Sequence, residues 1–238
     1  MRQRIRSTLR NIVAQLYWRS LNLRRSSFHI YYKDNYRAKL TDIATKYGTD
    51  KGGDFHVAPA PHNYTDLYEL ILINLKSTAQ NILEIGIGST NPLIVNNMGP
   101  LGSPGASLRM WREYFEHATV YGADIDESIL FNEERISCRK VNQLDLNSLS
   151  RLANELPNLD FILDDGMHDF WANRNTFEIF FPKLKEGGIY IIEDVSPKYA
   201  RRLLEYIESQ HPQTIFVRAQ TDSRSLLGDN NLIVSMKI

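Results

Sequence analysis

Apolar positions along residues 80–237 follow two alternating patterns. In short runs rich in β-branched and aliphatic residues nearly every position is apolar, and between these runs apolar residues recur every three or four positions. A continuous apolar run is typical of a strand buried on both faces of a parallel sheet, and the second pattern is typical of an amphipathic helix. The alternation predicts an α/β fold in which helices cover both faces of a mainly parallel sheet.

The two patterns predict seven strands and five helices in this region. The strands are expected at 80–86, 118–124, 136–142, 159–164, 188–193, 213–219 and 231–237. The helices are expected at 106–116, 128–134, 147–156, 170–184 and 197–210. The last two strands are joined by a loop rich in Asp, Ser, Gly and Asn without a helical pattern, which favours an antiparallel pair at one edge of the sheet. Six parallel strands and one reversed strand would then form the sheet.

The first forty residues differ in charge from the rest of the chain. They contain ten Lys or Arg against one acid, Asp34, whereas the formal net charge of the whole chain is zero. Residues 5–21 place apolar side chains at helical spacing among arginines, which predicts a basic amphipathic helix. Such a helix can lie on an anionic membrane, or it can pack on its own domain or on a second subunit of a homo-oligomer; we favour packing.

The chain is therefore divided into a basic N-terminal extension, 1–40, and one domain, 41–238. The start of this domain, 41–75, has a helical pattern interrupted by a glycine-containing loop at 47–53. A neutral overall charge gives no reason to expect a nucleic-acid partner, and the single cysteine, Cys138, excludes an intramolecular disulfide. Without a membrane-length apolar run or a signal-like start, we expect a cytoplasmic protein, with peripheral contact at the inner membrane face through 1–25 as the further hypothesis.

Two acidic motifs stand where predicted strands end. They are Leu163-Asp164-Asp165-Gly166-Met167-His168 and Ile191-Ile192-Glu193-Asp194. Ligands of open α/β sheets gather outside the carboxyl ends of the strands, so the carboxylates and the imidazole are expected in one crevice, where they suit a hard divalent cation and a general base. The alternative is that Asp164 or Asp165 caps the next helix and that Glu193 and Asp194 lie in a solvated loop.

Residues after the first three predicted strands suit a nucleotide-like cofactor. Glu84-Ile85-Gly86-Ile87-Gly88 ends the first strand, where glycine lets a ligand approach the backbone, but Asn91 stands where a dinucleotide fingerprint needs glycine. Asp124 ends the second strand and can accept both hydroxyls of a ribose, or it can cap a helix in place of Asp126. Gln143 follows the third strand and could meet an adenine edge or, like Asp145, serve a turn.

A long loop, Ser89 to Gly105, separates the first strand from the next helix. It is rich in Asn, Gly and Pro, and loops of this length beside a crevice are often functional. Ser107 lies at the expected helix start, where its hydroxyl can cap the helix or contact a cofactor carboxylate.

With these residues assembled, the chain resembles the macrolide-sugar O-methyltransferases, the family of the mycinamicin and demethylmacrocin enzymes, between about Tyr47 and Tyr199. The resemblance rests on Lys46-Tyr47-Gly48-Thr49-Asp50-Lys51, Leu83-Glu84-Ile85-Gly86, Gly105 to Trp111, Tyr121-Gly122-Ala123-Asp124-Ile125, Asp164-Asp165-Gly166-Met167-His168, Phe181-Pro182 with Lys185-Glu186-Gly187-Gly188, and Ile192-Glu193-Asp194. One departure is Met167, where the family usually has serine. Another is the basic first segment, which the resemblance does not cover.

The resemblance implies a seven-stranded Rossmann-like class I methyltransferase sandwich that transfers a methyl group from S-adenosylmethionine to a sugar hydroxyl with Mg²⁺. Position by position it implies Asp165, Glu193 and Asp194 as metal ligands, His168 as the general base, and Thr49, Glu84, Gly86, Ser107, Asp124 and Gln143 as cofactor contacts. The acceptor would be a small molecule or a glycan, and Trp111, Phe170 and Trp171 could stack on its sugar ring or pack in the core. A non-catalytic binding scaffold and, less favoured, a nicotinamide-dependent oxidoreductase are the alternatives.

Overall fold

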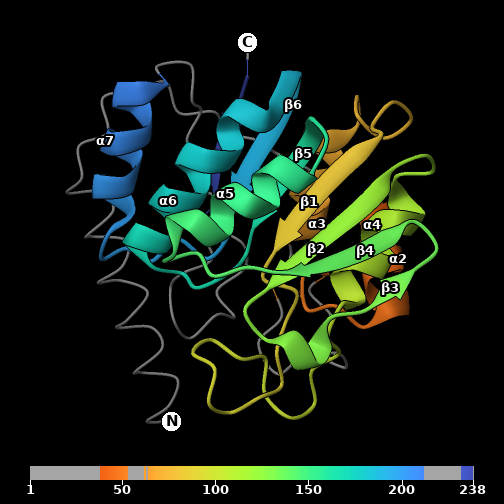
Figure 1. Cartoon of the computed structure of the whole chain (residues 1–238). Helices are drawn as coiled ribbons and strands as arrows, with labels where there is room; N and C mark the ends of the chain where they lie inside the picture. The colour runs from red at the N-terminus through yellow and green to blue at the C-terminus, as the bar shows by residue number, and fades with distance from the viewer. Residues whose placement is uncertain (1–37, 53–61, 63, 212–231, 238) are drawn as a thin grey trace, which may run out of the picture.

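A seven-stranded sheet forms the centre of the computed structural model, which describes residues 38–52, 62, 64–211 and 232–237 (Figure 1). The strands lie in the order β3-β4-β2-β1-β5-β6-β7. They are β1 Asn81–Ile85, β2 Thr119–Asp124, β3 Asn132–Glu133, β4 Ile136–Lys140, β5 Leu159–Asp164, β6 Leu184–Ile192 and β7 Ile233–Met236. The expected α/β fold is confirmed.

The central strands are parallel and the two edge strands are not. β4, β2, β1, β5 and β6 pair in parallel, β3 runs antiparallel to β4, and β7 runs antiparallel to β6. The reversed direction of the last strand is therefore confirmed. The strand expected at 213–219 lies outside the described residues, so its pairing with the last strand stays a prediction.

Helices pack on both faces of the sheet. They are α2 Lys39–Tyr47, α3 Tyr64–Leu72, α4 Ala106–Tyr114, α5 Leu146–Glu155, α6 Phe170–Phe180 and α7 Ala200–Gln210, with the 3₁₀ helices η1 Glu127–Ile129 and η2 Phe181–Lys183. One buried apolar cluster joins the first three helices to one face, and a second joins the last three to the other face (Figure 1). This sandwich buries both faces of the parallel strands, which accounts for their continuous apolar runs.

Two expected helices are wrong in part. Instead of a helix at 128–134, the chain forms the single turn η1, and β3 then folds back on β4 through Arg135, whose φ is 58°. The three apolar side chains at 129–131 pack as partly buried residues beside the core. The helix expected at 170–184 ends at Phe180, because Pro182 cannot donate to the helical ladder, and Leu184 already belongs to β6.

The helical entry expected from residue 41 forms as α2 and α3, with α2 beginning slightly earlier, at Lys39. Ala38 and Leu40 are fully buried, so the described domain includes them. The rest of the basic extension, including the helix expected at 5–21, lies outside the described residues. Within the described ranges, no helix has both the length and the apolar character required to span a membrane.

Candidate active site

One cavity of about 410 Å³ opens at the carboxyl ends of the parallel strands. Almost all the residues expected as metal ligands, general base or cofactor contacts line it: Thr49, Gly86, Ser107, Asp124, Gln143, Asp165, His168, Glu193 and Asp194. The exception is Glu84, which is 1% exposed and lies in β1 just behind the cavity wall. We call Glu84, Gly86, Ser107, Asp124 and Gln143 the β1/β2/β4 half of the cavity. We call Asp165, His168, Glu193 and Asp194 its β5/β6 half.

Gly86 stands where the two halves touch. Its φ is 84°, in the left-handed region that favours glycine, and its N–H donates to Ala123 O of β2 at 2.8 Å. A Cβ at this position would lie 2.0 Å from the backbone oxygen of Asp165. Glycine is therefore required by the close approach of the chain after β1 to the chain after β5.

The Asp124 carboxylate is oriented by backbone groups. Its two oxygens accept from Ile87 N and from Asp126 N, each at 2.9 Å. Burial raises the pKa of Asp124, although these hydrogen bonds act in the opposite direction. Asp126 caps η1 by accepting from Ser128 N at 3.0 Å, so the alternative that Asp124 is the helix cap is wrong.

The amide of Gln143 is engaged by the protein itself. Its nitrogen donates to Asp164 Oδ1 at 2.7 Å and to Thr176 Oγ1 at 3.0 Å, and its oxygen accepts from Met167 N at 2.8 Å. These bonds hold the loop after β5 against the chain after β4. Contact with a cofactor stays a prediction for Gln143, whereas Asp145 has the capping role, accepting from Asn147 N of α5 at 2.9 Å.

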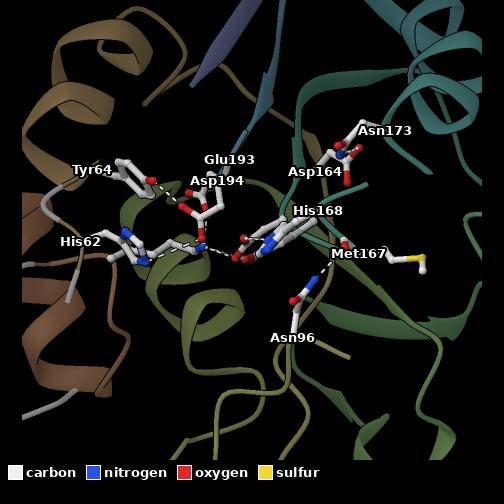
Figure 2. A network of polar contacts seen from close by, with 12 residues as sticks. His62, Tyr64, Asn96, Asp164, Met167, His168, Asn173, Glu193 and Asp194 are labelled. Atoms are coloured by element: carbon white, nitrogen blue, oxygen red, sulfur yellow. Dashed lines mark hydrogen bonds and ion pairs between the residues drawn. The ribbon is translucent and has the colours of Figure 1, made fainter. Parts of the chain in front are cut away.

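In the β5/β6 half, side chains from two strand ends converge. Ligand atoms of Asp165, His168 and Asp194 lie within 4.8 Å of one another, and His168 Nε2 is 3.1 Å from Asp165 Oδ1 (Figure 2). His168 and Asp194 have φ values of 52° and 50°, strained for residues with a Cβ. The N-cap of α6 is Asp169, so the alternative that Asp164 or Asp165 caps this helix is wrong. Glu193 is 1% exposed, so it does not lie in a solvated loop.

The charges of this half perturb one another. Burial lowers the pKa of His168, but the hydrogen bond that the imidazole donates to Asp165 and the nearby carboxylates outweigh burial and raise the pKa to about 9. Burial alone would raise the pKa of the Asp165 carboxyl, but Lys51 and His168 outweigh burial and hold this pKa below its ordinary value. Asp194 differs, because burial raises its pKa despite His62 and His168. Asp165 and His168 therefore form an ion pair in this structure.

Sequence analysis missed the partners that the segment from α2 to α3 supplies. Lys51 Nζ donates to Asp165 Oδ2 at 2.5 Å and to Glu193 Oε2, while the Tyr68 hydroxyl donates to Glu193 Oε1. The Tyr64 hydroxyl donates to Asp194 Oδ1 (Figure 2). Tyr64 and Tyr68 lie one turn apart on α3, and this spacing of two hydroxyl-bearing rings is the signal that could have indicated them.

His62 adds a second imidazole to this side of the cavity. Its ring stacks on Tyr64 with 4.8 Å between centroids, and its Nε2 lies 3.6 Å from Asp194 Oδ2. In Figure 2 it lies on the opposite side of Asp194 from His168. Asp194 is thus positioned between groups from β5 and from the N-terminal segment.

The long loop after β1 forms part of the cavity wall. Residues 93–98 line the cavity, and Asn96 Nδ2 donates to Met167 O at 2.6 Å, linking the loop to the chain after β5 (Figure 2). None of the three aromatic candidates for sugar stacking lines the cavity: Trp111 and Phe170 are buried, and Trp171 is 48% exposed outside it. Core packing is the correct interpretation for the first two.

Comparison with known proteins identifies relatives of this domain. The chain is 34% identical over 181 residues to L-olivosyl-oleandolide 3-O-methyltransferase of Streptomyces antibioticus, an alignment that covers 76% of this chain and 43% of that enzyme. It is 31% identical over 161 residues to mycinamicin VI 2''-O-methyltransferase of Micromonospora griseorubida, covering 67% of this chain and 37% of that enzyme. The chain thus matches less than half the length of these relatives. No family model matches it.

Solved structures agree on the fold. The MycE methyltransferase from the mycinamycin biosynthetic pathway, in complex with Mg, SAH and mycinamycin VI, superposes with a TM-score of 0.63 at 26% identity, covering 84% of this chain and 55% of that one. An O-methyltransferase from Bacillus cereus in complex with SAH superposes with a TM-score of 0.53 at 18% identity, covering 86% and 93%, which supports the fold alone. The chain therefore has a class I methyltransferase fold and is a relative of the sugar O-methyltransferases of polyketide pathways.

Proposed function

We propose that this protein transfers a methyl group from S-adenosylmethionine to a hydroxyl of a sugar, with Mg²⁺ bound in the β5/β6 half of the cavity. The observation that carries the proposal is the convergence of Asp165, His168 and Asp194 in the same cavity as the turn at Gly86 and the Asp124 carboxylate. A cation site beside a nucleotide-like site is what a metal-assisted transfer requires. The two relatives from Streptomyces antibioticus and Micromonospora griseorubida are named as O-methyltransferases.

The donor atoms fit a hard divalent cation. Carboxylate oxygens of Asp165 and Asp194, already within ligand-sharing distance, suit Mg²⁺, and Glu193 would complete the set once its Oε2 is released by Lys51. Bound Mg²⁺ would acidify a coordinated hydroxyl and neutralise the charge that develops on its oxygen. The phenol of Tyr64 would hold Asp194 in place through the hydrogen bond that it already donates.

His168 is proposed as the group that removes the proton of the hydroxyl. In the metal-free protein its pKa of about 9 keeps the imidazole protonated at neutral pH, because Asp165 and Asp194 attract the proton. When the two carboxylates serve as ligands, this attraction weakens and the imidazole can be neutral, as a general base must be. The strained backbone at His168 would hold the ring at the cavity.

The β1/β2/β4 half is proposed to bind the cofactor. Asp124 faces the cavity at the end of β2 with both oxygens oriented by backbone N–H groups, so free lone pairs remain for ribose hydroxyls. Gly86 leaves room for the cofactor beside the backbone. Thr49, Ser107 and Gln143 line the same cavity, and Glu84 supports the turn from behind.

Methyl transfer to a panel of deoxysugar glycosides tests the proposal. The chain is incubated with isotopically labelled S-adenosylmethionine and Mg²⁺, and the glycosides are analysed by mass spectrometry for the gain of one methyl group. Loss of transfer in excess chelator and recovery with added Mg²⁺ are expected. Full transfer in chelator would contradict the metal, and binding of S-adenosylmethionine without any metal-dependent transfer would favour the scaffold alternative.

The basic segment 1–25 is proposed to bind either an anionic membrane surface or a second subunit. Salt-sensitive sedimentation with anionic vesicles, lost when these residues are deleted, would support a peripheral membrane contact, because each basic residue near an anionic surface contributes on the order of 1 kcal/mol. Conversion of a larger assembly into smaller species by the same deletion, without vesicle binding by the intact protein, would support a homo-oligomer contact instead.

A further inference from the structure

Lys51 is the buried cation of the β5/β6 half. Its side chain is 3% exposed and lies on the segment between α2 and α3, while the carboxylates that it contacts lie on β5 and β6. The ammonium donates to one oxygen of Asp165 and one oxygen of Glu193. Two of the three carboxylates proposed as metal ligands are thus neutralised by a lysine.

The same oxygens cannot serve the ammonium and a divalent cation together without strong repulsion between the two cations. The other oxygen of each carboxylate also has a partner, because the Tyr68 phenol donates to Glu193 Oε1 and His168 Nε2 contacts Asp165 Oδ1. Either the cation stays out of full coordination or the ammonium moves away.

A second carboxylate lies within reach of the ammonium. Glu84 Oε1 is 3.8 Å from Lys51 Nζ, is fully buried, and has no hydrogen-bond partner of normal geometry in the described part of the chain. The nearby Ser107 hydroxyl nevertheless acts on this carboxyl as a donor and lowers its pKa, against the larger effect of burial. Its other oxygen, Oε2, accepts from Trp111 Nε1 at 3.0 Å. A shift of about 1 Å would bring Nζ into hydrogen-bond range of Oε1, and the flexible lysine stem allows such a shift without backbone movement.

We propose that Lys51 is a positioning residue with two positions, one on Asp165 and Glu193 in the metal-free protein and one on Glu84 when a divalent cation occupies those two carboxylates. This inference rests on the proposed function, since it assumes that the cavity binds Mg²⁺. In the first position the ammonium neutralises the carboxylates of Asp165 and Glu193. In the second position it neutralises the buried Glu84 carboxylate.

The movement would connect the two halves of the cavity. Glu84 belongs to the strand that leads directly into the turn at Gly86, and it holds Trp111 of α4. Arrival of the ammonium at Oε1 withdraws electron density from the carboxylate and weakens its hydrogen bond with the Trp111 indole. Metal binding in one half is thereby transmitted to the wall of the other half.

The indole N–H resonance of Trp111 reports this movement in the intact protein. Mg²⁺ alone is added to the full chain at pH 8, above the pKa of about 7 to which burial raises Glu84, and the resonance is followed by NMR. The resonance is expected to shift in the wild type and to stay in place in Lys51→Met. If Lys51→Met does not fold, Lys51→Gln is measured in its place, because the glutamine amide keeps a hydrogen-bond donor for Glu193. A shift that persists without Lys51 would overturn the inference.

Metal affinity in a double-mutant cycle provides the second measurement. Glu84→Gln removes the carboxylate to which the ammonium would retreat, so calorimetry should show Mg²⁺ binding weakened about tenfold or more when Lys51 is present and much less in the Lys51→Met background. Lys185→Met, which breaks a lysine–carboxylate pair with Asp160 outside the cavity, is the matched control and should leave the affinity unchanged.

The outcomes separate the two proposals. Equal weakening by Glu84→Gln in both backgrounds, or Mg²⁺ binding with an unmoved Trp111 resonance, would overturn the two-position lysine and leave the proposed function intact. Absence of Mg²⁺ binding to the wild type would overturn both.

Discussion

The two halves of the cavity are held together in different ways. In the β1/β2/β4 half, the Asp124 carboxylate is fixed by backbone, because it accepts from Ile87 N and Asp126 N just beyond the strand ends. In the β5/β6 half, Asp165, Glu193 and Asp194 are fixed by Lys51, Tyr64 and Tyr68, which lie 114 to 142 residues away in the sequence.

This difference separates orientation from charge compensation. A sheet can orient a single carboxylate with its own N–H groups, because each N–H group stabilises a negative charge locally. Several carboxylates brought to one point need cations and donors, since burying unpaired charges costs several kcal/mol each. The segment from α2 to α3 supplies these groups, so the β5/β6 half depends on how this segment packs on the sheet.

Asp165→Ala gives the largest expected effect, confined to the β5/β6 half. Methyl transfer should fall by at least about 10³-fold, because the substitution removes a proposed metal ligand and the partner of His168. The affinity for S-adenosylmethionine, measured by calorimetry, should change little. Asp145→Ala is the control: it removes the cap of α5, costing about 1 kcal/mol of stability, and should retain transfer. Normal transfer by Asp165→Ala would place the metal elsewhere.

His168→Ala should lower turnover by roughly 10²–10⁴-fold, the usual effect of removing a general base, while Mg²⁺ and cofactor still bind. Single-turnover kinetics at saturating cofactor measures the chemical step, and the exposed His117 provides the matched control substitution, His117→Ala. If turnover by His168→Ala is normal, another group, such as His62 on the other side of Asp194, is the base.

Sequence reasoning was sufficient to predict that the residues at strand ends lie in one cavity and insufficient to predict their partners. Asp124, Asp165 and Glu193 could be found because each follows an apolar run, and parallel strands bring their carboxyl ends to one edge. Lys51 belonged to a motif that had been noticed, but nothing local indicates that its ammonium reaches β5 and β6. The helix expected at 128–134 failed for a related reason, since pairing of β3 with β4 outweighed a short apolar run.

Gly86→Ala tests the contact between the halves. The added Cβ would meet the Asp165 backbone at 2.0 Å, and the residue would also keep a φ of 84°, so a loss of roughly 2–4 kcal/mol in unfolding free energy is expected. Gly48→Ala is the matched control, because Gly48 has a φ of 76° but no atom within 4 Å of the added Cβ. Chemical denaturation should show a loss of only about 1 kcal/mol for this control. Equal losses would mean that backbone conformation alone, and not the approach of the two strand ends, requires glycine at residue 86.

Asp124→Asn gives the smallest expected effect and is confined to the β1/β2/β4 half. The variant keeps the size of the side chain but loses the charge and one acceptor, so the affinity for S-adenosylmethionine should weaken roughly 10–100-fold, as for one or two hydrogen bonds to a charged group. Mg²⁺ affinity should stay nearly unchanged.

The neighbouring Asp126→Ala removes the cap of η1 and the partner of Ser89, so it should lower the melting temperature and leave cofactor affinity nearly unchanged. Calorimetry beside a thermal melt distinguishes the two variants. Unchanged cofactor affinity with a lowered melting temperature in Asp124→Asn would show that this carboxylate, like Asp126, only stabilises the loops, and that the ribose is held by other groups of the cavity.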